Sequence, residues 1–221
     1  MNEFPRPEEL LALTGGIVER SLGITLPPTT VSSTIDRDVI LASWKYIHGL
    51  AEKHHAEYVA AYGDEFSAYH DEYDPARLSD EGIFRRLAFA TVMRCQGKTS
   101  ILPDGTDIWI RDDLSQSPYA FTMLHEQFHN GFVACAPTPE TRERTIVAGA
   151  YLAEANRREE RVVDILTRRH VRGLYSRVGL TPESPCLVEM LSSTTPDTSE
   201  TIGVSDRDLA LTLIDTFQRG F

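Results

Sequence analysis

Cysteine is scarce in this sequence and is never closely paired. The chain of 221 residues contains three, Cys95, Cys135 and Cys186, and no two of them form a CxxC motif. Thiolate zinc sites need such close pairs, and disulfide frameworks need an even number of cysteines. We therefore expect neither a thiolate zinc site nor disulfide bonds.

The sequence also lacks long apolar runs and an excess of basic residues. No apolar run approaches the roughly 20 residues that span a bilayer, and the first residues lack the basic and apolar regions of a signal peptide. The formal net charge of −11 repels phosphate backbones and anionic membranes on average. We expect a cytoplasmic protein with no direct nucleic-acid ligand and no membrane association.

Helical periodicity dominates the remaining pattern, so the expected fold class is α+β and mainly helical. Residues 1–35 carry prolines around a short apolar piece and are expected to form a partly ordered arm. Residues 36–180 are expected to form the main domain. Residues 181–221 predict a loop rich in Ser, Thr and Pro, followed by a C-terminal helix.

Capping residues and turn residues divide the main domain into elements. Helices are expected over 36–62, from residue 80, over the segment that Asn130 and Gly131 end, and over 139–172 with a kink near Gly149. Their expected N-caps, and that of the last helix, are Asp36, Ser79, Thr138 and Ser205. The segments KTSIL and TDIWI predict a β-hairpin around residues 103–105. Its second strand, 106–111, is either an open sheet edge for an extended substrate or a structural hairpin on the core.

The strongest motif is HEQFH, from His125 to His129. Histidines four residues apart share one helix face, so both imidazoles can bind one ion. Glu126 is rotated off that face and can accept a proton from a water that the metal activates. We expect one Zn²⁺ per chain, with His125 and His129 as ligands and Glu126 as the catalytic base. The alternative is that both histidines are ordinary helix residues.

A catalytic zinc needs a third protein ligand, and the next long helix offers Glu154, Glu159 and Glu160. At about 100° per residue, Glu154 falls among arginines and Glu159 falls among apolar residues. Glu160 shares a third sector with Asp164, so we predict Glu160 as the ligand and leave the other two glutamates open. Asp164 is then expected to accept a hydrogen bond from a ligating imidazole.

The combination of HEQFH with the later ERVVD segment, Glu160 to Asp164, resembles the gluzincin metallopeptidases. Residues 80–172 are most similar to the ImmA/IrrE-type peptidases, because GTDIWIRDDLSQSPYAFTMLHEQFH has a strand, a polar loop and Phe121-Thr122 before the motif. This resemblance implies a minimal zincin-like fold, with a small β-sheet or hairpin beside the active-site helix. It also implies peptide-bond hydrolysis, with a protein or peptide substrate such as a transcriptional repressor.

Several further side chains stay open at this point. Tyr119, His170 and Tyr175 are candidate donors to a developing oxyanion, although each is also a plausible packing or surface residue. His54, His55 and His70 are expected to be surface histidines rather than a second metal site. Two other functions remain: a zinc-containing binding or regulatory module without proteolysis, and a zinc hydrolase acting on a small amide or ester.

Overall fold

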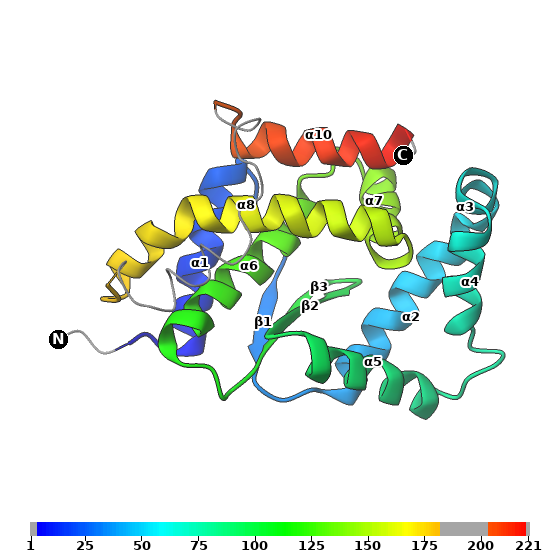
Figure 1. Cartoon of the computed structure of the whole chain (residues 1–221), viewed down its shortest axis with the longest axis horizontal. Coiled ribbons are helices and arrows are strands. Elements are labelled where there is room, and N and C mark those ends of the chain that lie inside the picture. The colour runs from blue at the N-terminus through cyan, green and yellow to red at the C-terminus, as the bar shows by residue number, and fades with distance from the viewer. Residues whose placement is uncertain (1–3, 182–202, 220–221) are drawn as a thin grey trace.

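A computed structural model of the chain describes residues 4–181 and 203–219, and its helices surround a small sheet (Figure 1). The helices are α1 (Pro7–Leu22), α2 (Arg37–Lys53), α3 (His55–Tyr62), α4 (Asp64–Glu72), α5 (Asp80–Arg94), α6 (Gln116–Ala134), α7 (Pro139–Tyr151), α8 (Ala153–Arg177) and α10 (Asp206–Arg219). The strands are β1 (Thr29–Ser32), β2 (Gly97–Leu102) and β3 (Gly105–Ile110). The mainly helical α+β class is confirmed, and the zincin-like assignment stays a prediction.

The sheet has three strands in the order β1-β3-β2. Strands β2 and β3 form the expected antiparallel hairpin, and β1 runs parallel to β3 on its other side. Of the two alternatives for residues 106–111, the structural hairpin on the core is confirmed and the open edge is excluded, since β3 is the buried central strand. The pairing of β1 with β3 was not predicted, because β1 has only four residues and lies in the segment expected to be an arm.

Helix α6 lies at the centre of the fold, with the sheet on one side and α8 on the other (Figure 1). It does not end at Asn130 and Gly131 as expected, but continues to Ala134. A Cβ atom at Gly131 would overlap with Cγ1 of Val18, so this glycine permits close packing against α1. Asn130 is buried, and its side chain forms hydrogen bonds with Thr106 and Thr29 of the sheet.

The N-terminal and C-terminal segments share one core with the middle of the chain. Residues 7–22, expected to belong to a partly ordered arm, form the regular helix α1, with Leu10, Val18 and Leu22 fully buried. Helix α10 adds Ile214 and Phe217 to the same cluster of buried side chains. The division of the chain at residues 35 and 180 stays a prediction, and most of the expected loop at 181–204 lies outside the described residues.

The expected capping residues are confirmed, but two helix lengths were wrong. At the starts of α2, α5, α7 and α10, a side-chain oxygen accepts a hydrogen bond from a backbone N–H of the first turn. These side chains belong to Asp36, Ser79, Thr138 and Ser205. The first long helix stops at Lys53 instead of Tyr62, and a separate α3 follows His54. Instead of a kink near Gly149, the later stretch breaks at the buried, extended Leu152.

None of the helices in the described residues combines the length and the apolar character that a membrane span requires.

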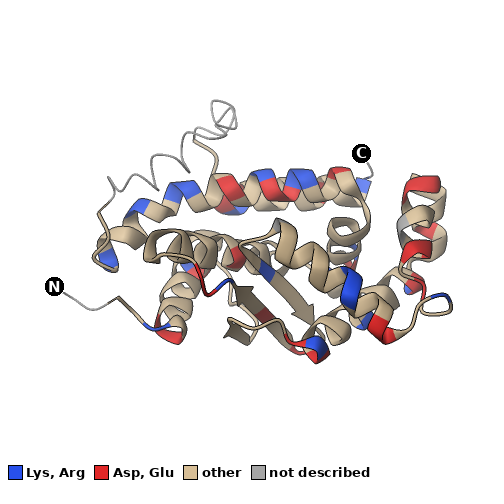
Figure 2. Cartoon of the chain, turned by 60° about the horizontal axis from the view of Figure 1, so that its bottom comes forward, with Lys and Arg blue, Asp and Glu red and all other residues tan. Residues whose placement is uncertain are grey.

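Charged residues are distributed unevenly over the elements. Helices α3 and α4 carry acidic residues but no Lys or Arg (Figure 2). This corner of the protein therefore attracts cations more strongly than the arginine-bearing surface of α8.

Asp206 at the start of α10 joins three helices. Its carboxylate accepts hydrogen bonds from Ser21 of α1 and from Arg169 and His170 of α8. Burial alone would raise the pKa of Asp206, but the hydrogen bonds from His170, Ser21 and Arg169 outweigh burial and lower it. The ionised carboxylate thus stabilises the attachment of α10.

Replacing Asp206 by Asn is expected to lower the free energy of unfolding at pH 7 by about 1 to 3 kcal/mol, because charged hydrogen bonds are lost. A carboxylate with a lowered folded-state pKa stabilises above its unfolded pKa and loses that contribution as pH falls. The difference between wild type and Asp206→Asn should therefore shrink below about pH 4. Urea unfolding of both proteins at several pH values measures this difference in unfolding free energy. A difference that stays constant down to pH 2 would contradict the stabilising role of the ionised Asp206.

Candidate metal site

Three predicted ligands converge where α6 faces α8. His125 and His129 lie one turn apart on α6, and their Nε2 atoms are 3.2 Å apart. The Glu160 carboxylate of α8 reaches both of them, with Oε2 3.4 Å from His125 Nε2 and Oε1 3.5 Å from His129 Nε2. The imidazoles are largely buried, whereas half of the Glu160 side chain is exposed.

This arrangement fits a tetrahedral metal ion. Ligand atoms about 2.0 to 2.1 Å from a tetrahedral zinc lie roughly 3.3 to 3.4 Å from one another. The two Nε2 atoms are 3.2 Å apart, and each has one oxygen of the Glu160 carboxylate at 3.4 or 3.5 Å, which is close to that value. Two imidazoles and one carboxylate are also a donor set that catalytic zinc sites use, with a fourth position left for a small molecule. The residues present therefore fit Zn²⁺.

Glu159, one residue before the candidate ligand, orients His129. The Nδ1 atom of His129 donates a hydrogen bond of 2.8 Å to Oε1 of Glu159, which leaves Nε2 free for the ligand cluster. Burial lowers the pKa of His129, but its contacts with Glu159 and Glu160 outweigh burial and raise the pKa well above the usual value. Burial likewise raises the pKa of Glu160, and its contacts with His125 and His129 outweigh that and lower it.

A glycine on α7 makes room for Glu159. A Cβ atom at Gly149 would lie 2.7 Å from Oε2 of Glu159, which is closer than real Cβ atoms approach. Gly149 therefore does not mark the kink expected at that position, but a close contact between α7 and the carboxylate that orients His129.

Glu126 is buried beside the ligand cluster and is held by strand β2. The hydroxyl of Thr99 lies 2.8 Å from Oε2 of Glu126 and 3.0 Å from its backbone carbonyl oxygen, and its single proton can go to either. A Cβ atom at Gly97 would lie 2.5 Å from Thr122 and 3.0 Å from Cγ of Glu126. Glycine at position 97 therefore lets the strand approach α6 closely enough to hold this carboxylate.

No protein-family model, no curated protein and no solved structure matches this chain. The resemblance to ImmA/IrrE-type peptidases therefore remains an expectation drawn from the motifs.

A cavity of about 510 Å³ opens beside the cluster, so a ligand can reach the candidate metal site. Its walls come from α2, α5, β2, α6, α7 and α8. Glu126, His129, Glu159 and Glu160 all line it. Its size lies in the range of roughly 300 to 1,000 Å³ that is typical of ligand pockets.

The remaining carboxylates of α8 lie outside the cluster. Glu154 forms ion pairs with Arg157 and Arg158, as its position among arginines predicted. Asp164 was expected to accept a hydrogen bond from a ligating imidazole, but it bonds Arg168 instead, and Glu159 contacts His129 in its place. On α8, the carboxylates that contact the α6 histidines are those of Glu159 and Glu160.

The three candidate oxyanion donors do not line the cavity. Tyr175 is fully buried and donates to the backbone carbonyl of Ser117, while His170 is bonded to Asp206. Tyr119 is partly buried among apolar side chains near the core. The polar side chains that do line the cavity wall include Lys98, Tyr151 and Asn156, none of which belongs to a recognisable motif.

The expectation of surface histidines at positions 54 and 70 was wrong. Both side chains are buried, and each lies against a carboxylate: His54 against Glu143 and His70 against Glu52. Their charged sequence context suggested exposure, but α3 and α4 fold back and bring both residues against the core. Thr99, Gly97 and Gly149 were also missed, since single Thr and Gly residues carry no spacing signal.

Replacing Glu160 by Ala is expected to weaken zinc binding by more than about 100-fold, because a direct ligand is lost. Glu159→Gln should fall in the roughly 10 to 100-fold range of residues that orient a ligand. The matched control is Glu154→Ala on the same helix, which should retain wild-type affinity. Competition with a chromogenic chelator ranks the three variants, and a larger loss for Glu154→Ala would show that the ligand is misassigned.

Replacing Gly149 by Ala is expected to weaken zinc binding by about 10-fold, because the new Cβ displaces the Glu159 carboxylate. The control is Gly173→Ala on α8, where a Cβ atom would meet nothing within 4 Å. Alanine there should leave zinc affinity unchanged and stabilise the helix by roughly 0.5 to 1 kcal/mol. Equal zinc affinities for both variants would refute the orienting role of Glu159.

Proposed function

We propose that this chain is a zinc-dependent peptidase, with His125, His129 and Glu160 as metal ligands and Glu126 as general base. The observation that carries the proposal is the convergence of Nε2 of His125, Nε2 of His129 and the Glu160 carboxylate, with separations of 3.2, 3.4 and 3.5 Å. This cluster lies next to the buried Glu126 and borders the cavity. A site that only stabilised the fold would have no need of that additional carboxylate or of the open space.

Each side chain has a distinct role in the proposed reaction. Zinc, when bound, supplies Lewis-acid polarisation of the substrate carbonyl and a water that ionises near neutral pH. Glu126, held by Thr99, takes the proton of the attacking water and later gives it to the leaving amine. Glu159 keeps the His129 ring in one tautomer and orientation.

Strand β2 is the proposed binding edge for an extended substrate. It is an outer strand of the described sheet, and residues 97–101 line the cavity next to Glu126. A peptide can add to such an edge through main-chain hydrogen bonds, and side-chain pockets then select its sequence. The substrate class that the motif resemblance implies is a transcriptional repressor or another protein.

The developing oxyanion needs a donor besides the metal. Lys98, Tyr151 and Asn156 line the cavity and replace the three donors expected from the sequence. Burial lowers the pKa of Lys98, while Cys95 and Glu126 oppose that shift. The nearness of Lys98 to Glu126 makes it the first of the three to test.

A second candidate function is hydrolysis of a small amide or ester. The cavity volume of about 510 Å³ supports it, because pockets of that size commonly enclose small molecules. The two candidates share the metal ligands and Glu126, so they differ only in substrate. A parallel assay with a peptide library and with small amides separates them.

Glu126→Gln keeps the size of the side chain and removes the basic carboxylate. This variant is expected to bind zinc as the wild type does, because Glu126 is not among the converging donors. Hydrolysis should fall by at least the roughly 10² to 10⁴-fold attributed to general acid-base catalysis. The rates of zinc-loaded wild type and variant on the same peptide library measure the effect.

The control is Glu154→Gln, which removes an exposed carboxylate from α8 and should leave hydrolysis unchanged. Equal rates for wild type and zinc-loaded Glu126→Gln would refute the role of Glu126. Zinc binding without hydrolysis of any peptide or small amide by the wild type would instead favour a binding or regulatory module.

A further inference from the structure

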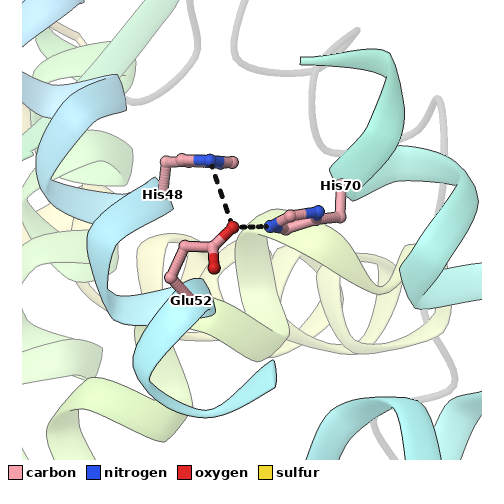
Figure 3. A group of neighbouring side chains, drawn as sticks. All are labelled: His48, Glu52 and His70. Carbon is pink, nitrogen blue, oxygen red and sulfur yellow. Dashed lines mark ion pairs between the residues drawn. The ribbon is translucent and has the colours of Figure 1, made fainter. Parts of the chain in front are cut away.

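A second group of metal-binding side chains lies away from α6 and α8. His48 and Glu52 lie one turn apart on α2, and His70 lies on α4 (Figure 3). Oε1 of Glu52 is 2.8 Å from Nε2 of His70 and 3.6 Å from Nε2 of His48. One donor atom from each of these residues falls within 4.8 Å of the other two.

His70 is buried without a hydrogen bond at Nε2. Less than a tenth of its side chain is exposed, and Nε2 has no hydrogen-bond partner among the described residues despite the nearby Glu52 oxygen. The two atoms are close but not aligned as donor and acceptor. Such an arrangement is expected of two ligands that point at a common ion instead of at each other, and a buried nitrogen without a hydrogen bond is otherwise costly.

His48 is oriented in the way that metal-binding imidazoles usually are. Its Nδ1 atom lies 3.0 Å from the hydroxyl of Tyr151 on α7, so Nε2 is the nitrogen directed towards Glu52 (Figure 3). An outer hydrogen bond on one ring nitrogen commonly fixes the other for a metal. The rings of Trp44 and His70 stack on His48 and hold it further.

We propose that His48, Glu52 and His70 form a second binding site for a divalent transition metal, with Zn²⁺ as the probe. Two imidazoles and a carboxylate are suitable donors for that ion. The acidic side chains of α4 attract cations to this corner (Figure 2). Glu52 is 56% exposed, so the site is accessible from solvent.

The metal at this site would have a structural role. It would link α4 to α2, and through Tyr151 it would also hold α7. Trp44 and Tyr151 both line the cavity beside the first site, so the second ion would fix part of the cavity wall. This site does not depend on the proposed peptidase activity, because it shares no ligand with the first cluster.

The test uses the full chain in a background without the first site, His125→Ala/His129→Ala. This background is expected to bind one equivalent of zinc in native mass spectrometry and to gain thermal stability from it. Adding His70→Gln should abolish both the bound zinc and the gain. The matched control is His54→Gln, because His54 is also a buried histidine against a carboxylate but belongs to no cluster of three donors in the described part of the chain.

A background variant that binds no zinc would overturn the proposal, and so would retention of zinc after His70→Gln. Either result would mean that Glu52 and His70 only contact each other and hold no metal ion. If the double variant does not fold, cobalt titration of the wild type gives the answer. Saturation at two equivalents supports the second site, and saturation at one contradicts it.

Discussion

The close packing of α6 between the sheet and α8 is the constraint on which the rest of the structure depends. Phe128 and Phe132 of α6 are fully buried, and truncating such a side chain typically costs about 3 to 5 kcal/mol. Phe128 contacts the ring of His170 on α8, away from the ligand cluster. The same packing directs His125 and His129 towards Glu160, so core stability and site geometry come from one interface.

Glycines set how closely neighbouring elements approach one another around this helix. Gly131 allows α1 to pack closely against α6, and Gly97 allows β2 to do the same. Gly149 on α7 leaves room for the Glu159 carboxylate. A methyl group at any of them would press on a neighbouring side chain at less than 3 Å. The buried carboxylates of Glu126 and Glu159 are tolerated because each has a hydrogen-bond partner at 2.8 Å.

The helical content, the hairpin and the candidate ligands could be predicted because each leaves a local pattern. The HExxH spacing identified His125, Glu126 and His129, and the helical wheel separated Glu160 from Glu154. Contacts between distant segments leave no such pattern. The pairing of β1 with β3, the hydrogen bond from Thr99 to Glu126, and the burial of His70 all depend on tertiary packing, so the sequence did not predict them.

The central claim is that one ion is held between α6 and α8 by His125, His129 and Glu160. A crystal structure of the protein grown with zinc, with anomalous data collected at the zinc edge, tests it most directly. The expected result is an anomalous peak about 2.0 to 2.2 Å from Nε2 of both histidines and from a carboxylate oxygen of Glu160. Absence of a peak there, or a different carboxylate in the place of Glu160, would contradict the account.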